Sequence, residues 1–278
     1  MKVYKSINNN ITSAFDDNGR EIVVIGKGIG YKAKEGDVIP PEKIDKIFLM
    51  SSRDNMERLK ELFASLSTEY IEITDEIFEY AKKHLDKRLN ESAFLTLADH
   101  ISFAITRFKQ DMIFQNVLLA EVRRFYSKEF EVGLYAVELM KRRLNVDMPE
   151  DEAASIALHI LNAEYDISIS EAFHSTQLID KIIEIISKEL GYKINTGDHY
   201  CDRMITHLRY MTQRIIRREP YPETGSESFF DMVLEQYPKE TRCAEKVATM
   251  VLQEHEFEMS KDEISSLAIH IKRLKFSE

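Results

Sequence analysis

The strongest constraint on the fold is a stretch of sequence that occurs twice. Residues 151–160 read DEAASIALHI, and residues 262–271, found 111 positions later, read DEISSLAIHI. A second histidine block precedes each copy, and its two versions, centred on His100 and His207, lie 107 residues apart. Two blocks in the same order, repeated with nearly equal offsets, indicate a duplicated domain.

Around these blocks, apolar residues recur at helical intervals. The spacing predicts helices over the following stretches: 56–63, 71–90, 95–108, 114–130 and 133–144. Pro149 and the acids after it suit the start of the helix that carries the first copy, because proline fits the first turn and acids favour the N-terminal end of the helix dipole. Ser260 and Glu263 form a capping box for the second copy. The second repeat is expected from about residue 168, with an exposed loop at 220–225.

The first 55 residues differ in composition from the rest. They hold five of the nine glycines, and short β-rich runs alternate there with turn signals. This pattern predicts four antiparallel strands at 3–7, 11–15, 21–25 and 46–50, with a hairpin turn at 16–19, where Asn-Gly tolerates positive φ angles. Four such strands enclose little apolar surface, so this β head is expected to need a partner copy.

Composition sets the class of protein. The chain has 278 residues, of which 44% are hydrophobic and 31% charged, and no apolar run approaches the ~20 residues of a membrane span. The N-terminus lacks the apolar core of a signal peptide, and the two cysteines are too few for a disulfide framework, so we expect a cytoplasmic protein. The net charge of −10 hides a basic head, since residues 1–34 hold six Lys/Arg against three acids.

The head invites two interpretations of its glycines. Residues 28–33, GIGYKA, fit a dinucleotide-binding pattern, but two prolines at 40–41 follow where that site needs a helix. RNA contact is the better interpretation, because asparagine amides match base edges, glycines allow close backbone approach and lysines neutralise phosphates. The alternative that these turns only build hairpins stays open at this point.

The motifs of the head then become specific. The pattern of Lys5 followed by 8–10 (NNN), with 23–31 (VVIGKGIGY), resembles the co-antiterminator RNA-binding domain of the BglG/SacY/LicT family, and the repeats resemble its two phosphotransferase-system (PTS) regulation domains. The resemblance covers the whole chain. It implies a dimeric head that binds an RNA hairpin in the leader of a sugar-utilisation transcript and blocks an overlapping terminator. The family's RNA-contact positions fall on Lys5, Asn8, Asn10, Gly26, Lys27, Gly28 and Tyr31. Lys27 stands where arginine is usual, which keeps the positive charge but loses the forked hydrogen-bond donors of a guanidinium. Tyr31 stands where phenylalanine is usual and keeps a ring that can stack on a base.

The repeated histidines have the pattern of phosphoryl acceptors. Glu152 and His159 are seven residues apart, which places them within about 20° on one helix face, and Arg107 and Arg214 likewise follow their histidines by seven. Neutral imidazole is a nucleophile near pH 7, and a guanidinium can hold a phosphate. The resemblance implies phosphorylation at His100, His159, His207 and His270, with Arg107, Arg214, Glu152 and Glu263 supporting the phosphate sites. It also implies two phosphoryl donors. Phosphorylation of the first domain by a sugar-specific enzyme II permease inhibits the protein, and phosphorylation of the second domain by the carrier HPr activates it.

Two other classes of protein share parts of this pattern. A metal-dependent phosphohydrolase would use paired histidines and carboxylates, but its usual ligand spacings are absent from the sequence. A DNA-binding activator with the same regulatory domains would need a helical head. We therefore expect an α+β multidomain chain, not an enzyme, with no cofactor or metal. A small all-β dimeric RNA-binding head (1–55) and a linker (56–65) should precede two duplicated all-α helical-bundle domains (66–168 and 169–278).

Overall fold

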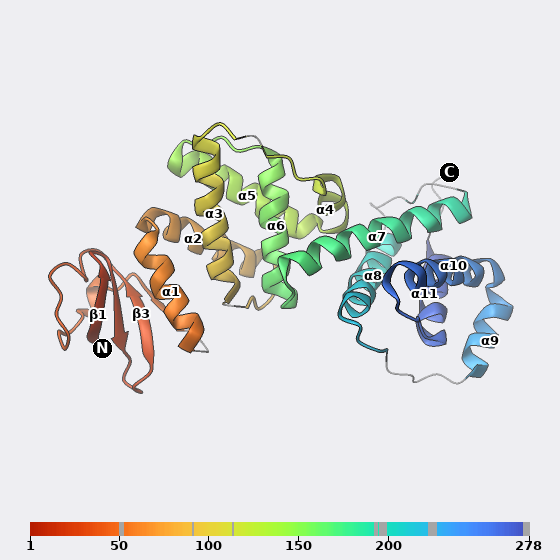
Figure 1. Cartoon of the computed structure of the whole chain (residues 1–278), viewed down its shortest axis with the longest axis horizontal. Coiled ribbons are helices and arrows are strands. Elements are labelled where there is room, and N and C mark those ends of the chain that lie inside the picture. The colour runs from red at the N-terminus through yellow and green to blue at the C-terminus, as the bar shows by residue number, and fades with distance from the viewer. Residues whose placement is uncertain are drawn as a thin grey trace. The chain divides into compact units, whose positions relative to one another are not determined.

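The computed structural model describes residues 1–49, 53–90, 92–112, 114–191, 194, 199–221 and 227–274. Within these residues the chain forms four strands, one short 3₁₀ helix (η1, Pro41–Lys43) and eleven α-helices, with all strands at the N-terminal end (Figure 1). The expected order, a small β head followed by helical regions, is confirmed. No helix among the described residues is long and apolar enough to cross a membrane.

The chain divides into two compact units. Unit 1 comprises Met1–Asn116 and Lys128–Asp166, and unit 2 comprises Val117–Ser127 and Ile167–Glu278. The β head therefore shares one unit with most of the first repeat. Residues 117–127, which interrupt the first repeat in sequence, belong to the same unit as the second repeat instead. The domain bounds expected from the sequence remain a proposal.

The head is a four-stranded antiparallel sheet in the order β1-β2-β3-β4. Its strands have these bounds: β1 Lys2–Asn8, β2 Ile11–Phe15, β3 Glu21–Ile25 and β4 Lys46–Phe48. The hairpin turn predicted between β2 and β3 is confirmed, because Gly19 adopts φ +76° and its N–H donates to the carbonyl of Asp16 at 3.0 Å. The predicted fourth strand ends too late, since β4 ends at Phe48 and Leu49 is not part of it, while Met50 lies outside the described residues.

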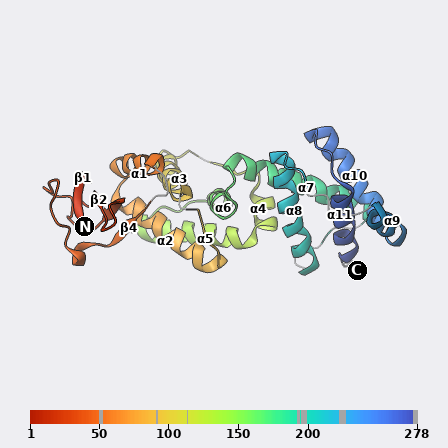
Figure 2. The same cartoon turned by 90° about the horizontal axis from the view of Figure 1, so that it is seen from below.

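Both faces of the sheet are apolar and both are covered. On one face, four buried strand residues pack against the head's own long loop, which contributes Ile29 and Ile39. The other face, formed by Ile11, Val23, Ile25 and Phe48, packs against helix α1 (Arg53–Ser65). Figures 1 and 2 both show α1 beside the sheet. Helix α1, which includes the expected linker 56–65, therefore covers this face within one chain, and the expected partner copy of the head remains a proposal.

Unit 1 continues with four helices that build on this shared core. They have these bounds: α2 Thr68–Leu85, α3 Ser92–Lys109, α5 Ser127–Leu144 and α6 Glu150–Tyr165. Phe48 and Phe63 lie 5.3 Å apart between ring centroids, and both approach Phe94 of α3, at 5.0 and 6.2 Å. Three aromatic rings therefore join the sheet, α1 and α3 into one core.

The predicted helix over 114–130 is wrong. The chain is not helical from Phe114 to Leu118, then forms the short helix α4 (Leu119–Phe125), and breaks at Tyr126 before α5 begins. Asn116 explains the first break, because its backbone N–H donates to Asp151 at 2.8 Å and its amide donates to the Ser155 hydroxyl at 3.1 Å. These bonds to α6 hold the segment outside a helix. The predicted helix over 71–90 also ends early, where Asp86 turns left-handed with φ +51°.

Unit 2 is helical throughout its described part. Besides α4, it contains α7 Ile169–Leu190, α8 His199–Arg217, α9 Glu227–Gln236, α10 Pro238–His255 and α11 Lys261–Arg273. The capping box predicted at Ser260 is confirmed, and a second one opens α7 at Ser168. Of the predicted loop at 220–225, residues 222–225 lie outside the described residues.

Candidate functional site

Helices α3 and α6 bring His100 and His159 together in unit 1. Their ring centroids lie 4.4 Å apart, with an interplanar angle of 36°. His100 Nε2 lies 2.6 Å from Oε1 of Glu152, and Arg107 donates through Nη2 to Oε2 of the same carboxylate at 2.5 Å. Glu152 is buried, and its charge is balanced inside the protein by the Arg107 guanidinium. The sequence placed these four residues on suitable faces, but it did not show that the histidines pair.

Two aromatic rings complete the surroundings of Arg107. Its guanidinium lies 4.3 Å from the ring centroid of Phe114 and 5.5 Å from that of Phe103. A guanidinium over an aromatic face is stabilised by the ring quadrupole. The arginine is therefore fixed beside the histidine pair.

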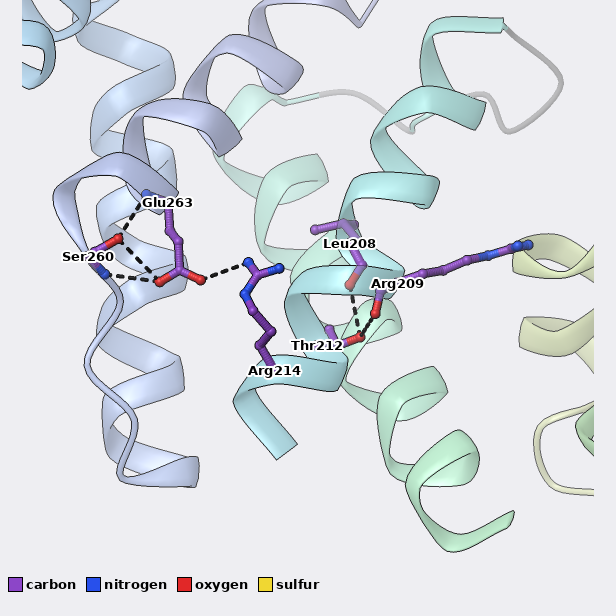
Figure 3. Close-up of polar contacts among 6 residues, drawn as sticks. All are labelled: Leu208, Arg209, Thr212, Arg214, Ser260 and Glu263. Carbon is purple, nitrogen blue, oxygen red and sulfur yellow. Dashed lines mark hydrogen bonds and ion pairs between the residues drawn. The ribbon is translucent and has the colours of Figure 1, made fainter. Parts of the chain in front are cut away.

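Unit 2 repeats this arrangement with α8 and α11. His207 and His270 stack with ring centroids 4.5 Å apart and an interplanar angle of 20°. Arg214 donates through Nη2 to Oε1 of the buried Glu263 at 2.9 Å, as Figure 3 shows, and lies 4.8 Å from the ring centroid of Tyr221. Each predicted histidine and arginine thus has a spatial counterpart. The two sites share the same plan.

Burial favours the neutral form of His159, His207 and His270. Loss of solvent, together with the neighbouring His100, lowers the pKa of His159 to about 3. Loss of solvent lowers the pKa of His207 to about 4, helped by His270 and Arg214. Burial also lowers the pKa of His270. Among the described residues, His100 Nε2, His159 Nδ1 and His207 Nε2 are buried without a hydrogen-bond partner. Uncharged imidazole is the nucleophilic form, so each pair contains an imidazole that burial holds in a state able to accept an electrophile.

These pKa values predict that acid destabilises unit 1. His159 ionises at about 3 when folded and near 6.5 when unfolded, so the unfolded chain binds more protons between those values. Its contribution to stability is complete above pH 6.5 and is lost as the pH falls through that window. We expect the free energy of unfolding to drop by about 2 kcal/mol from pH 7 to pH 5 through this residue. Urea titrations at both pH values should show a shallower pH dependence for His159→Gln, and equal slopes would contradict the assignment.

The other histidines lie outside the two pairs. His84 Nε2 is 2.8 Å from a carboxylate oxygen of Glu131, and His174 lies 3.4 Å from the hydroxyl of Ser170. The side chain of His199 is outside the described residues. No group of three or more histidine, cysteine or acidic side chains in the described part of the chain could hold a metal ion.

In the head, the predicted asparagines stabilise the turn that carries the glycines. Asn8 accepts from the backbone N–H of Asn10 at 2.9 Å and donates to the carbonyl of Phe63 in α1 at 3.1 Å. Asn10 accepts from the N–H of Gly28 at 2.8 Å. The turn between β1 and β2 is thereby fixed to the loop after β3.

The predicted glycines have different structural reasons. A Cβ at Gly26 would lie 1.8 Å from the carbonyl oxygen of Lys43, so only glycine fits there. Gly28 has φ +72° with open space around it, which leaves its surface accessible. Around this loop, Lys5 on β1, Lys27 and Tyr31 are exposed, and Tyr31 exposes 61% of its surface. Lys32, which the sequence interpretation missed, lies over the Tyr31 ring at 5.2 Å.

Known proteins share this organisation. The CAT RNA binding domain family matches residues 1–57, and the PRD domain family matches residues 75–163 and 180–274. The chain is 35% identical over 274 residues to the transcription antiterminator LicT of Bacillus subtilis (strain 168), covering 99% of both chains. It is 36% identical to the beta-glucoside operon antiterminator of Dickeya chrysanthemi, covering 99% of this chain and 97% of that protein. This chain belongs to the BglG/SacY/LicT family.

A solved structure supports the same layout for this family member. The crystal structure of GlcT CAT-PRDI is 31% identical, with a TM-score of 0.53, and covers 59% of this chain and 97% of that one. The family consists of RNA-binding transcription regulators and not of enzymes, so the phosphohydrolase alternative is not favoured. Nor is the DNA-binding alternative, because the head is a β sheet that matches an RNA-binding family.

Proposed function

We propose that this protein is an RNA-binding antiterminator of a sugar-utilisation operon, controlled by histidine phosphorylation. The head, as a dimer, binds a hairpin in the leader of the transcript. A sugar-specific enzyme II permease phosphorylates the first pair and inhibits, and HPr phosphorylates the second pair and activates. These partners act in the cytoplasm. They follow from the family and are proposals for this chain.

One observation carries the regulatory half of the proposal. Each repeat brings two half-buried imidazoles into contact with each other, next to an arginine paired with a buried glutamate. A phosphate adds about −1.5 to −2 charges, so phosphorylation beside Arg107 or Arg214 would disturb a balanced pair. The charge change at each pair would then bias the conformation of its unit.

The RNA-binding half rests on the surface around the β1–β2 turn. Lys5, Lys27 and Tyr31 are exposed there, so they offer two positive charges and a ring that can stack on a base. Phosphate contacts position a protein on RNA, whereas amides read bases. Asn10 and Lys5 should therefore contribute differently.

We expect Asn10→Ala to lower affinity for a specific hairpin by roughly 1–3 kcal/mol, with little change for unrelated RNA. Lys5→Ala should weaken both RNAs alike and reduce the salt slope by about one. The measurement is a salt titration of the full chain against a hairpin selected from a random pool and a scrambled hairpin of equal composition. Lys2→Ala is the matched control, because Lys2 is an exposed lysine at the opposite end of β1. If selection by the folded chain enriches no hairpin, the RNA-binding assignment fails.

A further inference from the structure

One residue of the head has a backbone conformation that its side chain does not favour. Lys32 adopts φ +58°, whereas the head's other described residues with positive φ, Gly19, Gly28 and Gly36, are all glycine. Left-handed backbone brings a Cβ close to the following carbonyl oxygen, a cost that glycine avoids. Every other described residue that has positive φ and is not glycine lies within two residues after a helix, where chains commonly turn left-handed. Lysine at position 32 therefore needs another explanation.

Lys32 lies in a turn whose two ends are fixed. The N–H of Ala33 donates to the carbonyl of Gly30 at 3.3 Å, which makes Tyr31 and Lys32 the central residues of the turn. A Cβ at Gly30 would lie 1.9 Å from the carbonyl oxygen of Asn8, so this end packs closely against the turn between β1 and β2. Ala33 packs against the buried cluster of the head. Tyr31 and Lys32 are thereby held on the exposed side of the loop.

The lysine side chain has a definite contact. Its ammonium lies 5.2 Å from the centroid of the Tyr31 ring, within the range in which a ring face attracts a cation. Tyr31 exposes 61% of its surface, so the ring stays accessible although one face carries the ammonium. Lys46 and Lys60 of the same unit are paired with acids. In the described part of the chain Lys32 has no acidic partner, which leaves its charge available to a ligand.

The contact with the ring does not by itself explain the lysine. An exposed cation–π contact contributes less stability than a left-handed backbone costs a residue with a Cβ. Glycine, which is favoured where the second central residue of a turn has positive φ, would therefore make this turn more stable than lysine does. Backbone strain of this kind is concentrated at sites that hold ligands. The ammonium and the ring next to it are the groups that a ligand could use.

We propose that Lys32 is a further RNA-contact residue that acts together with Tyr31. An unpaired base stacks on the face of the Tyr31 ring that the ammonium leaves open, and the ammonium neutralises a phosphate beside that base. The flexible four-carbon stem of lysine lets the charge reach the phosphate from the opposite side of the ring. This assignment rests on the proposed RNA binding of the head and adds a residue to it.

The test compares Lys32→Gly with the unchanged full chain in two measurements. Glycine removes the ammonium and relieves the left-handed strain, so the melting temperature should stay the same or rise. Affinity for a hairpin selected from a random pool should fall roughly tenfold at low salt, and the slope of log K against log salt should become shallower by about 0.7–1. A scrambled hairpin of equal composition should lose affinity by the same factor, because neither stacking nor a phosphate contact reads sequence.

Lys34→Gly is the matched control. Lys34 is an exposed lysine of the same loop, but its φ is not positive. Glycine there relieves no strain and loses more conformational freedom on folding, so the melting temperature should fall by about 2 °C. Affinity for both hairpins should stay near that of the unchanged chain. Lys32→Arg keeps a positive charge and should also retain affinity and salt slope.

A third substitution tests whether lysine and ring act together. Tyr31→Leu removes the stacking ring, and Lys32→Gly should then lower affinity by a smaller factor than it does in the unchanged chain, because contacting groups are not additive. Equal factors in both backgrounds would show that the two residues act independently.

Three other results would overturn the inference. If Lys32→Gly binds both hairpins as tightly as the unchanged chain, Lys32 does not contact RNA, although the proposed function stands. If its melting temperature falls as far as that of Lys34→Gly, the lysine stabilises the turn and strain does not mark a binding residue. An equal loss of affinity in Lys32→Arg and Lys32→Gly would show that RNA does not recognise the charge. If selection by the folded, unchanged chain enriches no hairpin, the proposed function fails and the assignment of Lys32 fails with it.

Discussion

Terminator read-through is expected to fall about tenfold in a His207→Ala variant. In a His100→Ala variant it is expected to rise by a similar factor under conditions in which the first pair is phosphorylated. The size follows from the usual range of coupling between a modification and a distant binding site. His207 is the proposed activating acceptor in unit 2, and His100 the proposed inhibitory acceptor in unit 1. Without His207 the protein should stay in its inactive state, because activation by phosphorylation is lost. Without His100 it should stay in its active state, because inhibition by phosphorylation is lost. A reporter gene placed behind the leader terminator measures both effects.

His84→Ala and His174→Ala provide matched controls for this experiment. His84 lies on a helix of unit 1 and His174 on a helix of unit 2, and neither belongs to a histidine pair. Read-through of both variants should remain near the wild-type level. Thermal unfolding of all variants separates a signalling effect from a loss of fold. The opposite pattern at His100 and His207 would show that the two domains have reversed roles. Unchanged read-through in both would remove the histidine pairs from the signalling pathway.

Local signals allowed much of the fold to be predicted. Strands β2 and β3 have the predicted bounds, because an Asn-Gly turn fixes the hairpin and its register together. The capping box at Ser260 was equally readable, since it depends on two residues three positions apart. The duplication predicted equivalent sites, and both contain two histidine rings in contact beside an arginine–glutamate pair.

Long-range contacts explain what the sequence did not predict. The segment 114–118 has helical spacing, but Asn116 bonds to two side chains of α6, and no local pattern reports partners 35 and 39 residues away. The covering of the sheet by α1 was missed for a related reason. An amphipathic helix indicates that it has an apolar face, but not which surface covers that face.

The sequence also did not predict which contacts the two glutamates, Glu152 and Glu263, make. Glu152 and Glu263 occupy the same place in the repeat, and helical spacing alone assigns them the same role. Their contacts differ: an oxygen of Glu152 lies 2.6 Å from His100 Nε2, whereas an oxygen of Glu263 accepts from the backbone N–H of Ser260 at 3.1 Å. The sequence shows that proline at 149 cannot form the capping box that Ser260 forms, but the contact with a histidine from another helix required the fold.

A Phe63→Ala variant is expected to lose about 3–5 kcal/mol of unfolding free energy in unit 1, the cost of truncating a fully buried phenylalanine. The Phe63 side chain is completely buried on α1. The centroid of its ring lies 5.3 Å from that of Phe48 in the sheet and 6.2 Å from that of Phe94 in α3, so its loss opens a cavity where the head joins the helices. Urea denaturation of the full chain, followed by circular dichroism, measures the change.

Phe15→Ala is the control, because Phe15 belongs to the same sheet but exposes 41% of its surface. It should change stability by no more than about 1 kcal/mol. The carbonyl of Phe63 also accepts from the Asn8 amide, so α1 contacts both the apolar face of the sheet and a proposed RNA-contact residue. If the head and the helices of unit 1 share one core, Phe63→Ala should lower the stability of both in a single transition. A separate head transition that shifts alone would show that α1 stabilises the sheet without coupling it to the first histidine pair.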